Sequence, residues 1–305
     1  MVLCLAVAYM LAEIIGGLLT GSLALLADSG HLLTDVLGLS MALAAIRFAR
    51  RPATPGLTYG FYRAEILAAL FNSVLLLAVA AWIFFAAWER LRSPIEVNAW
   101  PMLLVAVGGL VVTIIGARLL HAGAGESLNV RGAFLELVGD LFGAIGAIVA
   151  AMVILTTGWT LADPLISAVI GLLIVPRAWS LLRSVIDVLL ESTPSHLNMQ
   201  EVESAMREVD GVASVHDLHV WTITSGFDAM SAHVRSSGRR PSQDILHDLR
   251  EMLRKRFGIE HMTLQVEAAD HADDGACCIV DPRCFVPTTV PVPARWERSH
   301  TAPAE

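Results

Sequence analysis

Charged side chains are scarce in this chain. They make up 16% of its 305 residues, and Lys255 is the only lysine. The formal net charge is −8, so the chain lacks the broad basic face that binding to nucleic acid requires, and we expect no nucleic-acid partner. Cysteine is also rare: Cys4 lies in an apolar run, and the other three lie near the C-terminus. Four cysteines placed in this way do not indicate a disulfide framework.

Long runs of apolar residues make up most of the sequence before residue 190. Hydrophobic residues make up 55% of the chain and the mean hydropathy is +0.62, which favours an integral membrane protein over a soluble one. The first run contains Glu13 and has no basic residues before it, so we expect a membrane span there and not a signal peptide. Six runs are near the ~20 residues that cross a bilayer. They are Val2–Leu19, Ser22–Arg47, Arg63–Trp88, Trp100–Leu120, Leu128–Thr156 and Leu161–Leu190.

Basic residues indicate how these spans are oriented. The connections after the second and fourth spans are rich in arginine, whereas those at residues 20–21 and 157–160 contain no lysine or arginine. Because cytoplasmic loops carry the excess of positive charge, this asymmetry predicts that both termini are cytoplasmic. We expect a multi-pass protein of the plasma or inner membrane.

The character of the chain changes after Leu190. Helical spacing of apolar residues over Met199–Glu208 and Gln243–Phe257 alternates with strand patterns over Val215–Thr224, Ala229–Val234 and 262–266. The order αββαβ predicts a small α+β domain. We therefore expect a six-helix transmembrane domain over residues 1–191, a cytoplasmic domain over 192–269, and a mobile tail over 270–305.

The second span contains a polar stretch with ionisable side chains. His31 and Asp35 are four residues apart, so they lie one turn apart on the same face of a helix. Asp28 shares that face, as a ligand or as a brace for the helix. Glu136 and Asp140 repeat the spacing in the fifth span. Burying an ionisable group inside a span costs free energy, so such groups are functional candidates by default. The two pairs therefore predict one site for a divalent cation. The alternative is a polar network that holds two helices together.

Several motifs give the chain a family resemblance. It resembles the cation diffusion facilitator family, in particular the bacterial zinc, cobalt and cadmium efflux branch related to animal zinc transporters. The motifs that carry the resemblance are residues 21–28 (GSLALLAD), 30–35 (GHLLTD), 59–65 (YGFYRAE), 129–135 (NVRGAFL), 162–164 (ADP), 215–221 (VHDLHVW) and 260–267 (EHMTLQVE).

The resemblance implies a homodimer, six spans, a metallochaperone-like cytoplasmic domain and export of divalent metal in exchange for protons. It implies a transport site made by His31, Asp35, Glu136 and Asp140. Glu136 stands where the zinc branch usually has histidine. Because an added carboxylate favours harder metals, manganese and iron(II) are alternatives, and zinc remains the first choice.

Two other classes of function compete with a transporter. An intramembrane metal-dependent hydrolase needs a general base or an open coordination position, and the sequence contains no His-Glu-x-x-His motif. A metal sensor does not need paired ligands inside the membrane. We therefore expect an antiporter and not an enzyme, with no resident cofactor; zinc or another divalent transition metal is its substrate and a candidate regulatory ligand.

The cytoplasmic domain contains further candidate ligands. His216 and His233 on neighbouring strands are the best pair, with His261 and Glu267 as additional candidates; an ordinary role is the alternative for each histidine. His216 and His219 are three residues apart, so strand alternation predicts that they point to opposite faces. His261 and Glu267 lie ~20 Å apart along one strand and are not expected to share an ion.

The remaining polar residues have more ordinary expected roles. Glu13 and Asn72 are expected to make contacts between helices. Asp163 precedes a proline and is expected to cap the start of its own span. In the tail, His271 and the cysteines Cys277, Cys278 and Cys284 form a weak candidate site for a soft metal.

Overall fold

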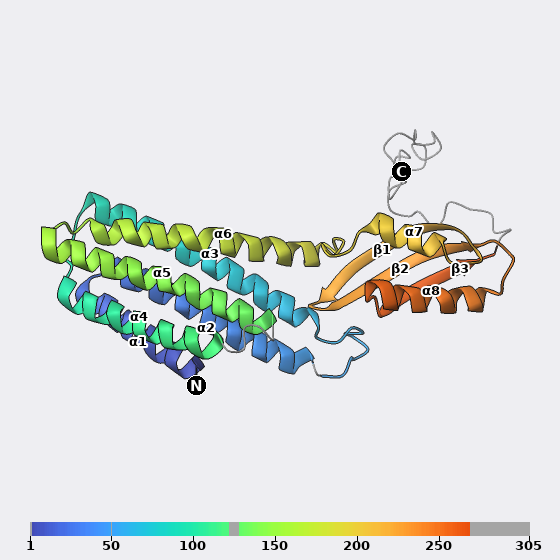
Figure 1. The fold of residues 1–305 in the computed structure, drawn as a ribbon, viewed down its shortest axis with the longest axis horizontal. Helices are drawn as coiled ribbons and strands as arrows, with labels where there is room; N and C mark the ends of the chain where they lie inside the picture. Colours follow the sequence, from blue (N-terminus) through green and yellow to red (C-terminus); the bar gives the residue numbers. More distant parts are fainter. Residues whose placement is uncertain (1, 50, 122–127, 269–305) are drawn as a thin grey trace, which may run out of the picture. The chain divides into compact units, whose positions relative to one another are not determined.

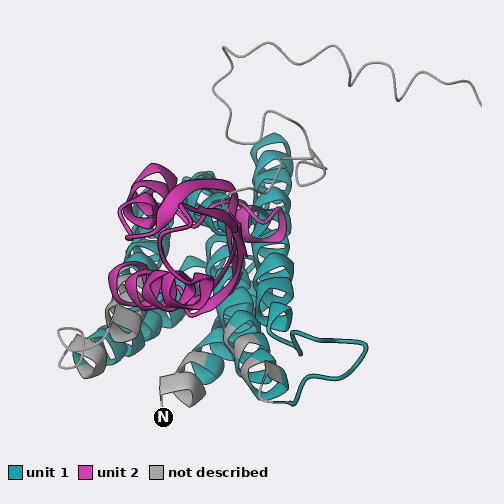
Figure 2. Cartoon of the chain, turned by 90° about the vertical axis from the view of Figure 1, so that its right-hand side faces the viewer, with its two compact units in different colours: residues 1–186 teal, residues 187–305 magenta. Residues whose placement is uncertain are grey.

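A computed structural model describes residues 2–49, 51–121 and 128–268 of the chain. The chain divides into two units, 1–186 and 187–305, whose described residues are shown in different colours in Figure 2. The first unit contains six long helices, which follow one another as α1 to α6 in Figure 1. They are α1 (Val2–Thr20), α2 (Leu23–Ala49), α3 (Arg63–Arg92), α4 (Ala99–His121), α5 (Leu128–Thr157) and α6 (Ala162–Leu189).

The helices begin and end close to the six apolar runs in the sequence. Among the described residues, four helical stretches are long and apolar enough to cross a membrane: α3, residues 99–118 of α4, residues 139–157 of α5, and α6. Residues 7–20 of α1 form a shorter apolar stretch. A helical transmembrane unit is therefore confirmed, whereas crossing by all six helices stays a prediction.

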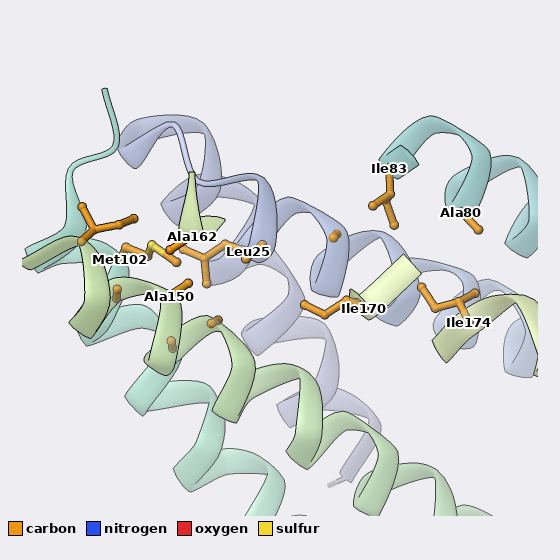
Figure 3. Close-up of a cluster of buried hydrophobic side chains, with 14 of the residues drawn as sticks. Leu25, Ala80, Ile83, Met102, Ala150, Ala162, Ile170 and Ile174 are labelled. Carbon is orange, nitrogen blue, oxygen red and sulfur yellow. The ribbon is translucent and has the colours of Figure 1, made fainter. Parts of the chain in front are cut away.

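Small residues form much of the interior of the helical unit. The buried cluster joins α2, α3, α4, α5 and α6 (Figure 3). Its alanines include Ala27, Ala80, Ala106 and Ala150, which allow neighbouring helix backbones to approach closely. Large apolar side chains such as Phe85 are exposed instead, as expected of groups that face lipid.

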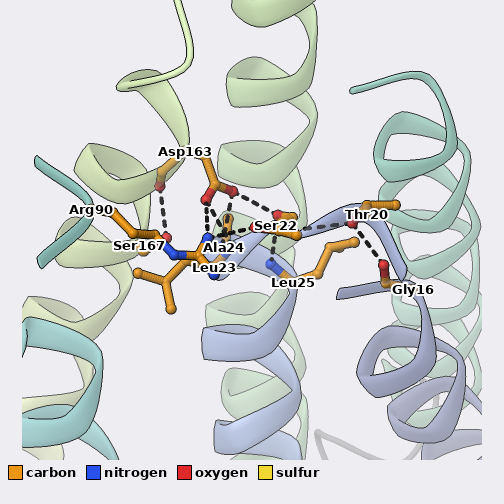
Figure 4. A network of polar contacts seen from close by, with 10 residues as sticks. Gly16, Thr20, Ser22, Leu23, Ala24, Leu25, Arg90, Asp163 and Ser167 are labelled. Carbon is orange, nitrogen blue, oxygen red and sulfur yellow. Dashed lines mark hydrogen bonds and ion pairs between the residues drawn. The ribbon is translucent and has the colours of Figure 1, made fainter. Parts of the chain in front are cut away.

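A buried carboxylate ties three of these helices together at one end (Figure 4). Asp163, in the first turn of α6, accepts hydrogen bonds from the Ser22 hydroxyl (2.6 Å) and from the backbone N–H groups of Leu23 (2.7 Å) and Ala24 (3.1 Å). The guanidinium of Arg90, at the end of α3, donates to the same carboxylate at 3.1 Å. The carboxylate is thus placed at the positive end of the α2 dipole.

This arrangement corrects the role expected for Asp163. The residue lies inside α6, and its side chain caps the first turn of α2 instead of the start of its own helix. Sequence reasoning considered only local capping. The partner lies about 140 residues away in the chain, where no local pattern points to it.

The second unit has the predicted order of elements. It consists of α7 (Met199–Arg207), β1 (Val212–Thr224), β2 (Phe227–Ser236), α8 (Ser242–Phe257) and β3 (His261–Glu267). β1 pairs antiparallel with β2, and β2 pairs parallel with β3. Because a parallel pair needs a crossover, α8 lies between β2 and β3 in the chain.

Both helices of this unit pack on one face of the sheet. Ile245, Leu249 and Leu253 form one buried stripe along α8, and Val202 and Met206 of α7 belong to the same core. Even-numbered apolar residues of β2, such as Met230 and Val234, point into it. The odd-numbered residues of β2, among them His233, therefore lie on the opposite face.

A bulge in β1 overturns the expectation that His216 and His219 point to opposite faces. His216 pairs with His233 and His219 pairs with Ser231, so three steps along β1 match two steps along β2. Asp217 absorbs the extra residue with a φ of +50°. Since Ser231 and His233 share a face of β2, the bulge places His216 and His219 on one face as well.

Replacing Asp163 by alanine should destabilise the helical unit strongly. The change removes the cap of α2 and leaves the partly buried guanidinium of Arg90 without this partner, and breaking a buried pair in this way costs about 3–5 kcal/mol. We expect a lower midpoint of thermal unfolding for the detergent-solubilised protein. Asp163→Asn keeps one acceptor oxygen and should lose less. Ser184→Ala, which removes an exposed hydroxyl from the same helix, serves as the control and should unfold with the wild type. Equal midpoints for Asp163→Ala and this control would contradict the role given to the carboxylate.

Candidate metal sites

Three of the four residues predicted for the transmembrane site lie together between α2 and α5. His31 Nε2 is 3.6 Å from Asp35 Oδ2, one turn further along α2, and 3.6 Å from Asp140 Oδ1 on α5. One ligand atom of each residue lies within 4.8 Å of the other two. His31 and Asp140 are buried, and Asp35 is half-buried. The spacing of the residues in the sequence therefore corresponds to a compact group in space.

The distances suit a small divalent cation. Zinc binds nitrogen and oxygen at about 2.0–2.2 Å, so two ligands of a tetrahedral ion lie roughly 3.3–3.6 Å apart. The two separations of 3.6 Å from His31 Nε2 already fall at the upper end of that range. The donor atoms of Asp35 and Asp140 lie within 4.8 Å of each other, so these two side chains have to come closer for all three donors to share one ion.

The fourth predicted ligand is Glu136. It belongs to α5 and precedes Asp140 by four residues, so helical spacing puts it on the same side of that helix. Its side chain lies outside the described residues, and the structure does not test its contact with the other three. Its place in the site stays a prediction.

A cavity of about 240 Å³ adjoins the group. It is lined by Asp28, His31, Gly139, Asp140, Phe142, Gly143, Ile170, Leu173, Ile174 and Arg177. α6 contributes the last four of these, so the cavity lies among α2, α5 and α6. The site has room beside it for a hydrated ion to approach.

Asp28 lines this cavity but does not belong to the three-residue group. Its carboxyl group is buried, as is that of Glu13 on α1, which accepts a hydrogen bond from the Tyr9 hydroxyl of the same helix. The contact between helices that was expected of Glu13 stays a prediction.

Sequence reasoning overlooked two residues near the site. Arg177 lines the cavity from α6, although it was not singled out among the charges of the sixth span. A lone arginine inside an apolar run is itself a signal by the rule that flagged the carboxylates. Tyr9 was not predicted, because a tyrosine in a span usually indicates only packing or an interfacial position.

A second group lies on the sheet of the other unit. Glu267 Oε1 is 3.1 Å from His233 Nδ1, and Glu267 Oε2 is 3.5 Å from His216 Nε2. The two imidazole rings lie 5.3 Å apart across the β1–β2 pair. The predicted pair of histidines is thus brought together, on the sheet face opposite α7 and α8, with a buried carboxylate between them. One nitrogen from each ring and one carboxylate oxygen form a ligand set typical of zinc.

Asp217 lies at the edge of this second group. Its carboxylate is 2.9 Å from His219 Nε2 and 3.9 Å from His233 Nε2. Strict alternation along β1 would point Asp217 away from the face that carries His233. The bulge in β1 changes this geometry and allows these contacts. Strand alternation alone could not have predicted them.

The other candidates are not brought into either group. His261 begins β3, at the opposite end of the strand from Glu267, and its ring packs near Phe227 with centroids 5.8 Å apart. His271, Cys277, Cys278 and Cys284 lie outside the described residues, as does the expected mobile tail from residue 270 onward.

Known proteins match the chain along most of its length. Metal cation efflux system protein CzcD from Cupriavidus metallidurans is 44% identical over 88% of this chain and 85% of its own. Zinc transporter ZitB from Escherichia coli is 42% identical over 85% of this chain and 83% of its own. The Bacillus velezensis protein named cadmium, cobalt and zinc/H(+)-K(+) antiporter is 39% identical, over 87% of this chain and 86% of its own.

The family matches divide the chain as its two units do. Residues 194–269 match the cation efflux protein cytoplasmic domain. Residues 1–190 match the cation efflux transmembrane domain. This part of the chain contains His31 and Asp35 on α2 and Asp140 on α5. The chain is therefore a membrane protein of the cation efflux, or cation diffusion facilitator, family.

Proposed function

We propose that this protein exports zinc, and also cadmium and cobalt, from the cytoplasm in exchange for protons. The observation that carries the proposal is the group of His31, Asp35 and Asp140, whose donor atoms lie within 4.8 Å of one another inside the helical unit. The names of the relatives, which refer to zinc, cadmium and cobalt and to antiport, support the choice of substrate.

The exchange of metal for protons follows from the ligand types. Histidine and carboxylate ligands bind metal only when they are deprotonated, so metal and protons compete for the same atoms. A site that faces the two sides of the membrane in turn can load metal where protons are scarce and release it where they are plentiful. An inward proton gradient then drives metal outward.

We assign the fourth ligand position to Glu136. The site then has one nitrogen and three carboxylate donors, with a formal charge of −3 before metal binds. Such a site still suits four-coordinate zinc. Export of manganese or iron(II) is the alternative within the same family, because additional oxygen ligands favour these metals.

The proposed architecture places six spans in the plasma or inner membrane with both termini in the cytoplasm. Residues 1–191 form the transport domain and residues 192–269 form a cytoplasmic domain for regulation and dimerisation. The match of residues 194–269 to a family of dimerisation-type cytoplasmic domains supports a homodimer. Binding of metal by His216, His233 and Glu267 would make this domain responsive to the cytoplasmic metal level.

Two other classes of function are less well supported. A hydrolase needs a general base or an open coordination position at the metal, and four protein ligands occupy a tetrahedral ion completely. A pure sensor needs no buried ligand group inside the helical unit. Metal-dependent hydrolysis by the purified protein, or metal resistance that survives deletion of the helices, would favour one of these alternatives.

Asp140→Ala should abolish zinc uptake into inverted membrane vesicles. Loss of residues that only support metal ligands costs about 10–100-fold in affinity or activity, so loss of a ligand should lower the initial rate by about 100-fold or more. The exposed substitution Thr156→Ala, on the same helix, is the control and should transport normally. Zinc uptake that persists in Asp140→Ala would contradict the assignment of the site. Uptake by the wild type that does not change with an imposed pH gradient would contradict exchange for protons.

Glu136→His should raise the preference for zinc over manganese. The change replaces a hard oxygen donor by an imidazole nitrogen and removes one negative charge, and both effects favour zinc. The measurement is the ratio of zinc to manganese uptake in vesicles, expected to increase about tenfold (1.4 kcal/mol). A ratio equal to that of the wild type would remove Glu136 from the ligand set.

Glu267→Gln should weaken zinc binding by the cytoplasmic domain of the full chain. The carboxylate lies between both histidines, whereas His261 lies at the far end of the same strand. Equilibrium dialysis of the purified protein should therefore show fewer zinc ions bound per chain for Glu267→Gln and an unchanged number for His261→Ala. The opposite pattern would assign the site to the other end of β3.

A further inference from the structure

The connection between α2 and α3 combines positive charge with exposed apolar side chains. Between Asp35 and Glu65 the chain contains no acidic residue, although acidic residues outnumber basic ones in the chain as a whole. The same stretch contains four arginines, Arg47, Arg50, Arg51 and Arg63. Arg63 begins α3, which is long and apolar enough to cross a membrane, so this loop adjoins the surface of the bilayer.

Hydrogen bonds within the loop hold it in a defined turn. The backbone N–H of Thr54 donates to the carbonyl oxygen of Leu57 at 3.1 Å, and the N–H of Leu57 donates back to Thr54 at 2.9 Å. The N–H of Gly60 also donates to the carbonyl oxygen of Leu57, at 2.8 Å. The turn projects beyond the ends of α2 and α3 (Figure 1), and the side chains of Leu57 and Tyr59 are 45% and 48% exposed.

Stacked side chains join the two ends of this loop. The guanidinium carbon of Arg51 lies 4.5 Å from the centroid of the Phe48 ring, at the end of α2. The Phe48 ring in turn lies 6.1 Å from the ring of Phe61, which precedes α3. Stacking uses the flat face of a guanidinium and leaves the N–H groups at its edge available to an acceptor.

The arginines at the end of α2 lack a carboxylate partner within the structure. Arg47 lies one turn before Arg51, and both side chains are exposed. Among the residues that the structure describes, no carboxylate forms an ion pair with either of them. Two groups of N–H donors with positive charge are therefore presented beside exposed apolar side chains, next to the start of a membrane-spanning helix.

We propose that the loop between α2 and α3 binds the headgroup of an anionic phospholipid. The N–H groups of Arg47 and Arg51 donate to the phosphate oxygens, an acceptor that suits the fork of a guanidinium. Leu57 and Tyr59 lie among the neighbouring lipids, as apolar and tyrosine side chains do at a membrane interface. The excess of positive charge next to a span selects anionic over zwitterionic lipid.

Binding of two lipids by the purified full-length protein tests the proposal. The protein in detergent is mixed with phosphatidylglycerol and phosphatidylcholine in equal amounts, and native mass spectrometry counts the molecules of each that stay bound. The wild type should retain phosphatidylglycerol in preference. Arg47→Gln combined with Arg51→Gln should lower the apparent affinity for phosphatidylglycerol by about tenfold or more, the size of effect expected for two arginines beside an anionic lipid, and leave phosphatidylcholine unchanged.

A matched pair of arginines on α8 serves as the control. Arg250→Gln combined with Arg254→Gln removes the same charge from exposed positions of the other unit, and this variant should bind phosphatidylglycerol like the wild type. An equal loss in both double variants would show a general effect of charge and overturn the site. An excess of inorganic phosphate should leave the lipid bound, and displacement would assign the arginines to free phosphate instead.

A variant that keeps every charge tests the stacked geometry separately. Phe48→Leu removes the ring beneath Arg51 and should lower the preference for phosphatidylglycerol about threefold, which is the loss expected for one cation–π contact. It also decides the matter if the double arginine variant does not insert into the membrane. An unchanged preference in Phe48→Leu would contradict the site and leave the arginines a role in topology alone. Because no outcome depends on metal transport, failure here leaves the proposed function intact.

Discussion

The cost of placing a carboxylate among apolar helices governs the helical unit. Three of its buried carboxylates have a partner that offsets this cost. Asp163 has a helix N-terminus and an arginine, Glu13 accepts a hydrogen bond from Tyr9, and Asp140 faces His31. The first arrangement is complete within the protein itself. In the proposed transport site the third includes a metal ion, and this difference would separate structural carboxylates from transporting ones.

Sequence periodicity predicted most of the fold for a physical reason. A span must be apolar over a fixed length, so the six helices could be placed from composition with small errors at their ends. The αββαβ order of the second unit followed equally from alternation and helical spacing. Both patterns are local, and local patterns are what a single sequence displays.

Contacts between distant residues were harder to predict. The group of His31, Asp35 and Asp140 could be anticipated because each pair repeats at helical spacing, which marks the facing sides of two helices. No repeat marks the contact of Asp163 with Leu23. The bulge at Asp217 was invisible for another reason, since one extra residue in a strand changes the face of every side chain beyond it.

The hydrogen bonds to Asp163 hold the first turn of α2, so a tilt of this helix would pivot about that end. His31 lies eight residues beyond Leu23, which corresponds to about 12 Å of helix at 1.5 Å per residue. A tilt of about 10° around that end displaces His31 sideways by about 2 Å, which is the length of one bond between zinc and nitrogen. In the proposed transport cycle, a small tilt of this kind, with no helix unwound, would be enough to break the coordination of the ion and release it.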